Sequence, residues 1–552
     1  MMSRFSNAAR SRILGSLCVF LCVSSVGNGY GAIVENLTVG NAKALALGNA
    51  VTADPPGIDS IHFNPAGLVR LDGRQMNLKL LVAAMQFEVD FGGHDSKTQQ
   101  AIEDYGYEDE AAYASSETST IGIKVPFTDG VKEWPLPFLV MPLGGASYSP
   151  PGSEVTYATA VYTPMAAGYI RDEDDPGRFM GEELSLVKIT YFSPSFGFQL
   201  TDTLSVGASV GMSWQGAGVK LPLRVPNSVL IFADTLVNLF QSQGLCPGQD
   251  DPTPFLDLCG GSVGPYTEIF DLEVDAEAPL VWNLNIGALW EPTPWFTWGF
   301  VYQAESIGHL EGSYRLEYGD EWVNFFGDLR QSDAWNVINA VIPFPSGLQD
   351  SPAGIGVETG DVSMDVIMPA HFSTGVSVQM TPAWKVNFDV KWTDWGAWEG
   401  LELEFDKQLD FLKLASLLSP YAELETLTIP RNYESVWNWA LGLEYQYNHN
   451  LAFRFGYEPR KTSIPDDKQD VLLPLGDAEL FAFGFEYRFG VDQIIEAGVG
   501  YLHAEADVPA GSSTNSNSSD QLNNIIYNPY AGTDFSSQVQ GLLFELSYTS
   551  SF

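Results

Sequence analysis

The sequence predicts an all-β protein, a 14-stranded antiparallel transmembrane β-barrel with an N-terminal plug inside its lumen. Three observations lead to this fold class. Apolar and polar side chains alternate along many segments, one face of each segment is rich in aromatic residues, and very short gaps between segments alternate with very long ones. A membrane barrel requires this pattern, because its outer face contacts lipid while its lumen is polar or filled with small side chains.

The composition limits the class of protein. The chain has 552 residues, of which 45% are hydrophobic and 17% charged, so it can bury a large core and is not disordered. Its formal charge of -42 argues against nucleic acid as a partner, because phosphate binding needs basic residues. An acidic surface suits solubility, salt tolerance or the binding of divalent cations.

Residues 1–31 have the layout of a secretory signal peptide. Three arginines precede an apolar run over residues 13–26, and small residues follow around Gly29 and Gly31. The apolar run is too short to span a bilayer as a stable anchor, so we expect cleavage after Gly31 and export of the remaining chain. After this leader no further run of about 18 apolar residues occurs, so strands are the membrane-crossing elements that the sequence predicts.

Residues 32–74 are too rich in Ala, Gly and Asp to form a lipid-facing strand, yet they directly precede the first strand. We expect them to fold into the barrel as a plug that closes an otherwise open pore. Within them Asn64, Pro65, Ala66 and Gly67 form a stiff turn, because Pro65 fixes φ and Gly67 permits a sharp reversal. An ordinary periplasmic turn is the alternative interpretation.

The barrel is expected to occupy residues 75–552. Four of its turns are only three residues long, whereas 218–279 and 306–365 are long excursions. Short turns on one side and long loops on the other are typical of outer-membrane barrels with both chain ends in the periplasm. The expected strands are 75–91, 134–147, 155–167, 188–200, 204–217, 280–291, 295–305, 366–380, 384–395, 436–447, 451–458, 479–489, 494–505 and 540–552.

A soluble β-sandwich also alternates, so the residues on each face decide between the two architectures. In 451–458 one face carries Leu451, Phe453, Phe455 and Tyr457, whereas the other carries Ala, Arg, Gly and Glu. A large soluble core would need bulky side chains pointing inward, but here the second face is small or polar. The aromatic content of 13%, with Trp and Tyr near strand ends, matches the aromatic girdles of a membrane barrel.

Two long loops carry apolar stripes at helical spacing, which we interpret as an extracellular surface that captures a hydrophobic ligand. Core packing is the alternative, but an extracellular loop has little core to join. A disulfide between Cys246 and Cys259, a pair that remains after the leader is removed, would brace the first loop; two free thiols are the alternative. Two cysteines without a nearby histidine are too few for a metal site, and we expect no metal and no cofactor. The stripe residues are Leu230, Ile231, Leu236, Val237 and Phe240 in the first loop, and the segment 409–418 forms the second.

The lumen offers few cations that are free to bind a carboxylate. Alternation points Arg454, Arg488 and Lys391 inward. Pairing across the turns would place Glu444 opposite Arg454 and Glu496 opposite Arg488, and opposite charges on neighbouring strands usually neutralise each other. A neutral aromatic or aliphatic hydrocarbon is therefore nearly as good a candidate ligand as a fatty acid.

The stretch "NAKALALGNAVTADPPGIDSIHFNPAGLVRLDG" resembles the N-terminal hatch of the FadL/TodX family of outer-membrane transporters. Later stretches, including "MPAHFSTGVSVQMTPAWKVNFDVKWTDW", also resemble this family. The resemblance implies a bacterial outer-membrane protein for the passive uptake of long-chain fatty acids or other hydrophobic molecules. It further implies that the ligand displaces the hatch and leaves sideways at a kinked third strand, which we place at Pro164 because proline cannot donate to a β-ladder.

Other functions are weighed against this one. The stretch 207–211 matches the G-x-S-x-G motif of hydrolases, but Ser209 lies within an unbroken alternation rather than at a strand-to-helix elbow, so we expect no enzyme. A general porin or an adhesin is less consistent with the plug. His62, beside the Asn-Pro-Ala-Gly turn, is interpreted as a packed plug residue.

The remaining partners are expected from surface features. The acidic run at 171–177 could bind divalent cations that bridge lipopolysaccharide, although solvated loop charge is the default interpretation. Phe552 ends an amphipathic last strand and resembles the signal that the bacterial barrel-assembly machinery recognises. We expect a monomer that contacts outer-membrane lipids and lipopolysaccharide and binds no nucleic acid.

Overall fold

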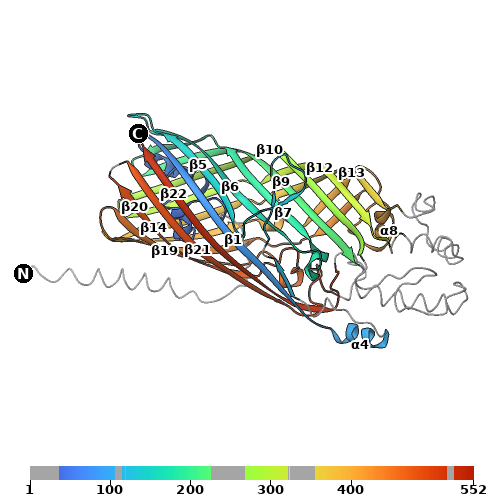
Figure 1. Ribbon diagram of the computed structural model, residues 1–552. Coiled ribbons are helices and arrows are strands. Elements are labelled where there is room, and N and C mark those ends of the chain that lie inside the picture. Colours follow the sequence, from blue (N-terminus) through green and yellow to red (C-terminus); the bar gives the residue numbers. More distant parts are fainter. Residues whose placement is uncertain are drawn as a thin grey trace, which may run out of the picture.

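The computed structural model describes residues 37–105, 115–118, 120–224, 268–320, 323, 355–490, 492–518 and 528–552. Within these residues the chain forms one closed antiparallel β-barrel of 14 strands, as the sequence predicts. The barrel closes where the first strand pairs with the last, from Gln75 opposite Ser551 to His94 opposite Thr533. Figure 1 shows the long, strongly tilted strands, with the C-terminus at one end of the barrel and helix α8 at the other.

Several of the 14 wall strands are interrupted, so they consist of two shorter elements. The wall is built from β1 (Arg74–His94), β2 (Ser115–Thr118), β5 (Leu139–Tyr148), β6 (Val155–Ile170), β7 (Glu183–Phe192), β8 (Ser195–Thr201), β9 (Leu204–Arg224), β10 (Glu268–Thr293), β11 (Phe296–Gln303), β12 (Ser306–Tyr318), β13 (Val357–Met368), β14 (His371–Thr381), β15 (Trp384–Thr393), β16 (Gly400–Phe405), β17 (Thr426–Pro430), β18 (Val436–Gln446), β19 (Leu451–Arg460), β20 (Asp477–Phe489), β21 (Gln493–Val508) and β22 (Thr533–Ser551). The helices outside the hatch are α4 (Ser96–Tyr105), η4 (Pro176–Met180), η5 (Trp395–Ala397), α8 (Asp410–Leu418) and η6 (Asp466–Lys468).

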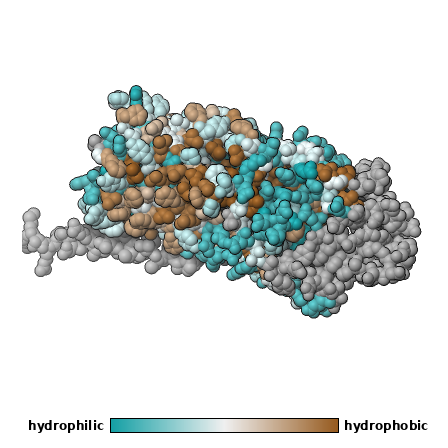
Figure 2. Space-filling model, in the orientation of Figure 1, coloured by the Kyte–Doolittle hydropathy of each residue, from teal (hydrophilic) through white to brown (hydrophobic). Residues whose placement is uncertain are grey.

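Strict alternation sorts the side chains between lipid and lumen. On β22, Leu542, Phe544 and Leu546 are exposed on the outer face, whereas Leu543 and Glu545 between them are buried. The outward residues of neighbouring strands join into an apolar belt, which Figure 2 shows as a brown band across the face in view. Because a bilayer solvates this belt, the exposed aromatic side chains need no covering protein surface.

Four short helices form the hatch inside one end of the barrel: α2 (Ala42–Ala46), η1 (Gly57–Asp59), α3 (Ser60–Phe63) and η2 (Pro65–Arg70). Helix α2 contacts β20 and β21, and η2 contacts β8, β9 and β10, so the hatch reaches opposite parts of the wall. Its apolar side chains pack together with Ala158, Ala160 and Tyr162 of β6. The expected signal peptide lies outside the described residues.

The structure differs from the sequence-based expectation in two regions, the longest loops and the second wall strand. Residues 218–279 and 306–365 were expected to be long loops, but parts of both are strand, because β9, β10, β12 and β13 continue far beyond the apolar belt. The second wall strand is interrupted, since β2 and β5 occupy its two ends and a separate hairpin of β3 (Gly122–Lys124) and β4 (Val131–Glu133) leaves the wall between them. The segment 134–147 is therefore strand only from Leu139 onward.

Candidate functional site

The Asn-Pro-Ala-Gly turn fixes the hatch to the wall through Asn64, which is fully buried. Its Nδ2 donates to the Thr52 carbonyl at 2.8 Å and to the Ala288 carbonyl of β10 at 3.3 Å, while its Oδ1 accepts from Ala66 N at 3.2 Å. Pro65 occupies the first turn of η2, where its missing N–H costs no hydrogen bond. Both polar ends of the asparagine are thus used: Oδ1 bonds within the hatch, and Nδ2 bonds to both the hatch and the barrel.

Lumen-facing glycines make room for this turn. A Cβ on Gly207 of β9 would lie 2.3 Å from the carbonyl carbon of Pro65, and a Cβ on Gly287 of β10 would lie 2.0 Å from Asn64 Oδ1. Within the hatch, Gly67 also has no room for a side chain, since its Cβ would lie 2.3 Å from Pro55 Cγ. The backbone of the hatch therefore rests directly on the backbone of the wall.

Buried ion pairs also hold the hatch. Asp59 accepts from Lys79 Nζ of β1 at 2.7 Å and from Asn41 Nδ2 at 2.7 Å, and both charged side chains are about 1% exposed. Asp54 binds Lys43 at 3.0 Å within the hatch and Lys385 of β15 at 2.6 Å. Removing one partner of a pair this deeply buried leaves a charge that water does not solvate.

The lumen arginines are arranged partly as expected. Arg454 contacts Glu444 at 2.7 Å in the expected register and is also paired with Glu496 at 2.6 Å and with Glu486. The expected contact between Arg488 and Glu496 is wrong. Phe489 pairs with Gln493 rather than with Ile495, so Arg488 lies opposite Ile494 and binds Glu486 on its own strand at 2.6 Å. Lys391 is neutralised by Glu458 at 2.7 Å.

Above the hatch the barrel encloses an apolar cavity with about 1080 Å³ of empty space, which we call the main cavity. Its lining contains no charged side chain among the described residues, and its few polar side chains include Tyr433, Thr462 and Ser463. Apolar residues from β6, β7, β9, β10, β13, β16 and β17 form most of the lining, together with two indole rings. These residues include Met165, Ala167, Leu184, Leu186, Ala217, Val219, Val274, Met364, Val366, Trp395, Trp398, Leu401, Leu403, Ile429 and Ile464.

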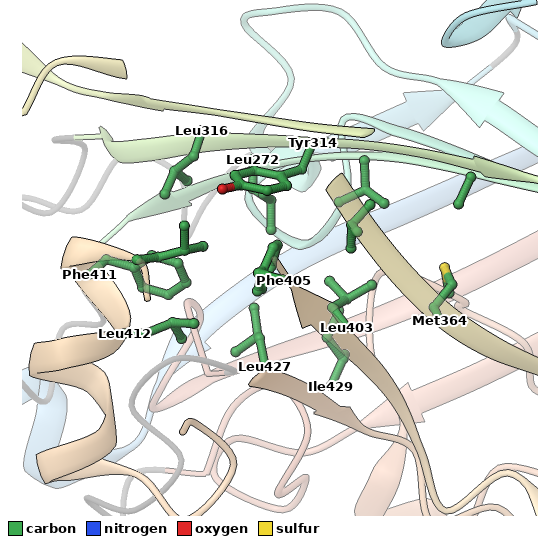
Figure 3. Close-up of a cluster of buried hydrophobic side chains, with 14 of the residues drawn as sticks. Leu272, Tyr314, Leu316, Met364, Leu403, Phe405, Phe411, Leu412, Leu427 and Ile429 are labelled. Atoms are coloured by element: carbon green, nitrogen blue, oxygen red, sulfur yellow. The ribbon is translucent and has the colours of Figure 1, made fainter. Parts of the chain in front are cut away.

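Helix α8 covers the apolar interior at the far end from the hatch. Figure 3 shows Phe411 and Leu412 of α8 pointing toward Leu272, Phe405 and Leu427, while Leu403 and Ile429 continue the cluster toward the main cavity. Phe411 is 6% exposed and Leu412 is fully buried. The interpretation of 409–418 as an exposed capture surface is therefore wrong: the described apolar side chains of this segment pack as core, because the extended strands supply an apolar interior above the membrane.

A second, more polar cavity with about 680 Å³ of empty space lies between the main cavity and the hatch, and we call it the lower cavity. The two cavities share Met165 and Trp395, and the hatch contributes His62 to the lower one. Lys188 of β7 also lines it; this side chain is 2% exposed and its Nζ donates to Ser306 Oγ at 2.6 Å. No ion pair joins Lys188 to any part of the chain that the structure describes.

Sequence reasoning missed Lys188, although a signal for it existed. The period of two that points Leu186 and Thr190 inward also points Lys188 inward, and its cross-strand neighbours are the neutral Met165 and Gln215. An inward lysine without an acidic neighbour on either adjacent strand is thus visible in the sequence once the register is known. The indole Nε1 of Trp395, at the junction of the two cavities, is buried and has no hydrogen-bond partner among the described residues.

Pro164 lies where the ladder of β6 is irregular. The register between β6 and β7 shifts between Tyr162 and Met165, so Thr163 and Pro164 form a break in the wall pairing. Pro164 itself lines the lower cavity. On the other edge of β6, Tyr157–Val161 pair with β5, whereas the described residues of β5 do not pair with β6 beyond this point.

The other sequence-predicted sites fall into two groups. The capture stripe at Leu230, Ile231, Leu236, Val237 and Phe240 and the pair Cys246 and Cys259 lie outside the described residues. Ser209 lies mid-strand in β9 opposite Ser195 and Asn285, and the strand continues to Arg224 rather than turning into a helix at the serine. His62 is 7% exposed and its ring contacts Phe63 edge-on and Tyr162 at a tilt, so the ring packs inside the hatch region.

Two features are absent from the described part of the chain. No helix there is long and apolar enough to cross a membrane. No group of three or more His, Cys, Asp or Glu side chains in the same ranges is placed to hold a metal ion.

A closed barrel with an apolar belt, an interior hatch and an apolar cavity above it defines a plugged membrane β-barrel. Residues 20–552 match the model of one family, described as outer membrane protein transport protein (OMPP1/FadL/TodX). The chain belongs to this family, and it is a protein of the bacterial outer membrane. The resemblance seen in the sequence is thereby confirmed.

Individual relatives are distant. The long-chain fatty acid transport protein of Escherichia coli O157:H7 is 23% identical over 213 residues, which are 38% of this chain and 43% of that protein, so the match spans less than half of the relative. The fold is similar to that of a Pseudomonas aeruginosa FadL homologue, with a TM-score of 0.62, 18% identity, and coverage of 95% of this chain and 100% of that one. It is also similar to the P. putida toluene transporter TodX, with a TM-score of 0.56, 18% identity, and coverage of 95% and 99%.

Proposed function

We propose that this protein is a passive channel for the uptake of hydrophobic molecules across the outer membrane. The observation that carries the proposal is the uncharged, apolar main cavity inside a hatch-closed barrel. Transfer of an apolar solute from water into such a cavity is favourable by about 25 cal/mol per Å² of apolar surface buried. The named relatives act on hydrophobic compounds of two kinds, long-chain fatty acids and toluene, which supports the same class of substrate here.

Within this class we favour an amphipathic carboxylate, such as a long-chain fatty acid. A chain lying in the main cavity would place its head past Met165 and Trp395, beside Lys188 in the lower cavity. A buried ammonium without a carboxylate partner is costly, and a bound carboxylate would supply the missing charge. Lys188 is therefore the lumen cation that we assign to the carboxylate.

A neutral hydrocarbon is the second candidate, and a specific observation favours it. Arg454, Lys391 and Lys385 are each neutralised by acidic side chains, and the main cavity offers a ligand no charge among its described residues. A small aromatic molecule could occupy that cavity beside Trp395 and Trp398 without reaching Lys188.

The route below the cavities is part of the proposal. Displacement of the hatch would open the lower cavity toward the periplasm, and the irregular pairing at Pro164 would allow sideways exit into the membrane. If Pro164→Ala left uptake unchanged, the exit would not depend on this break. The proposal gives the protein no catalytic role, because Ser209 lies in the middle of a regular strand.

The experiment measures binding of three ligands to the purified protein in detergent: oleate and oleyl alcohol, which differ only in the head group, and toluene. Lys188→Met keeps the volume of the side chain and removes the charge. We expect oleate affinity to fall by about tenfold or more, since a hydrogen bond to a charged group contributes roughly 1.5–3 kcal/mol. Oleyl alcohol affinity should stay within about twofold, and Lys97→Met on exposed helix α4 should change neither.

Three other outcomes are informative. Equal loss for both ligands would show that Lys188 acts through packing rather than charge. Binding of toluene but of neither oleyl compound would favour the neutral-hydrocarbon candidate. Binding of none of the three ligands to the wild-type protein would overturn the proposed function and favour a general porin.

A further inference from the structure

The barrel wall has a gap between β1 and the upper part of β6. A cavity with about 760 Å³ of empty space lies in this gap. Its lumen side is lined by Leu37 and Thr38 at the start of the hatch, and it shares Ala167 with the main cavity. Its other lining residues come from β1, β2, β5, β6, β7, β22 and the segment that follows β2, and they include Ala83, Met85, Phe87, Ile121, Ile123, Gly168, Tyr169 and Val187.

The gap reaches the outer face of the barrel at Val187. On β7, Leu186 and Lys188 face the lumen, so Val187 between them faces outward. Val187 is nevertheless only 2% exposed. An outward residue at this height would contact lipid, which means that another part of the chain covers it.

The covering segment is residues 120–138, which contain the β3–β4 hairpin and which we call the flap. Its first residues rejoin the wall through a bridge between Thr120 and Ile170 at the top of β6. The backbone N–H of Lys124 then donates to the outward Ser185 Oγ of β7 at 2.7 Å. A Cβ on the outward Gly218 of β9 would lie 2.6 Å from Val131 Cγ2, so the hairpin rests closely on the outer face of the sheet. Figure 1 shows β6, β7 and β9 side by side on the face that the flap crosses.

Two outward acids of β10 hold the flap in place. Val274 faces the lumen, so Asp275 and Glu277 point outward by alternation. Asp275 binds Lys124 Nζ at 2.6 Å and accepts from Gly130 N at 2.7 Å, while Glu277 accepts from Phe127 N at 3.0 Å and from the Trp214 indole at 3.0 Å. Carboxylates at the edge of a lipid belt are costly unless they are paired, and the flap supplies these partners.

The free edge of the flap is apolar. Phe127 is 76% exposed, Leu136 is 42% exposed and Phe138 is 36% exposed. The charged Lys132 and Glu133 are also exposed and suit the head-group region. Figure 2 shows a hydrophilic area at the edge of the brown belt over β7 and β9. Aromatic side chains at such a boundary favour the interface between head groups and acyl chains.

We propose that the flap is a lid over the outer mouth of the wall gap, clamped to Asp275 and Glu277 and anchored through Phe127, Leu136 and Phe138 in the outer leaflet. The clamp keeps the gap closed to lipid when no ligand is present. Its release joins the main cavity to the outer leaflet, so that a ligand passes from Ala167 into the bilayer. This inference rests on the proposed uptake of hydrophobic molecules.

A disulfide lock tests the lid directly. In Val131→Cys with Gly218→Cys the two Cβ atoms would be 3.9 Å apart, within the range of about 3.5–4.5 Å that a disulfide needs. As the matched control, Ile123→Cys with Lys132→Cys joins two paired residues of β3 and β4 and leaves the flap free to leave the barrel. Cys246 and Cys259 are changed to Ser in all variants so that they do not exchange with the new pairs.

Uptake of radiolabelled oleate is measured in cells that lack their own transporter, before and after reduction with dithiothreitol. We expect the oxidised lock to reduce uptake at least about tenfold, with recovery on reduction, while purified locked protein still binds oleate. The control pair should transport equally in both redox states. Equal uptake by the lock in both states, with the disulfide shown by mass spectrometry, would overturn the lid.

A second readout does not depend on the substrate. The Val187→Cys variant is treated with a lipid-soluble maleimide, and so is a second variant that combines Val187→Cys with Asp275→Asn and Glu277→Gln. Loss of these charged hydrogen bonds should raise the labelling rate by about tenfold or more. Glu311→Gln, an exposed acid on β12 in register with Glu277, should leave the rate unchanged. An unchanged labelling rate after release of the clamp would refute the lid whatever the substrate is. A lack of oleate uptake by the wild-type protein would instead refute only the assignment of a long-chain fatty acid as the substrate.

Discussion

Lys79→Met tests whether buried charge holds the hatch in the lumen. Lys79 and Asp59 are both about 1% exposed and lie 2.7 Å apart. Removing one partner of a buried pair costs about 3–5 kcal/mol, because the remaining charge is left without water or a counter-ion. Because the proposed displacement of the hatch leaves the wall folded, this cost should fall on the seated state. The ratio of protein with a seated hatch to protein with a displaced hatch should then fall roughly a hundredfold to a few thousandfold.

Single-channel conductance in a planar bilayer measures this ratio, because a displaced hatch opens a water-filled path for ions. Glu291→Gln is the matched control: it breaks the pair with Arg70 of the hatch at 2.8 Å, but those side chains are 34% and 30% exposed. An exposed pair contributes about 0–1 kcal/mol, so its open fraction should rise by no more than about fivefold. The reasoning would be refuted if both folded variants conducted equally.

Three further predictions concern other parts of the chain. Gly207→Ala should destabilise the seated hatch by about 1–3 kcal/mol, because the new Cβ would lie 2.3 Å from the hatch backbone; unchanged conductance and thermal stability would contradict this. Burial raises the pKa of Asp271, on the extracellular part of β10, to about 6 despite Lys220 at 3.3 Å. Between about pH 4 and 6 the native state then binds a proton that the unfolded state does not bind. The Tm of the wild type, measured relative to that of Asp271→Asn, should therefore rise as the pH falls through this window and stay constant below it. A Tm difference that does not change with pH would refute the pKa shift of Asp271. Cys246 and Cys259 should resist alkylation until reduced, and two modified thiols without reductant would exclude the disulfide.

The barrel could be predicted because period-two alternation and short turns are local signals. The turns at 201–203, 381–383 and 448–450 separate strands where the sequence places them. Alternation fixes which face a residue occupies but not its cross-strand partner, since a slip of two residues keeps every side chain on its face. This is why Arg488 was expected opposite Glu496 and instead lies opposite Ile494.

The cavities could not be predicted, because alternation does not determine which distant elements contact each other. The stripe in 409–418 has the same spacing whether it faces solvent or a core, and Leu412 is buried only because β12, β13 and β16 extend beyond the belt. The flap could not be predicted either, because Asp275 and Glu277 look like ordinary solvated acids until Lys124 is known to lie against them. By contrast, the role of the Asn-Pro-Ala-Gly turn could be predicted from local sequence, since the stiffness of the turn and the small residues around it both favour a plug.

Equilibrium binding of radiolabelled oleate to two tryptophan variants of β9 tests most directly whether the main cavity holds the ligand. Ala217 lines that cavity, whereas Ala208 on the same strand faces lipid beside Phe196 and Ile286. Ala217→Trp should fill the cavity and weaken binding by at least about tenfold, while Ala208→Trp should bind as the wild type does. Unchanged affinity in a folded Ala217→Trp protein would contradict the placement of the ligand in the main cavity.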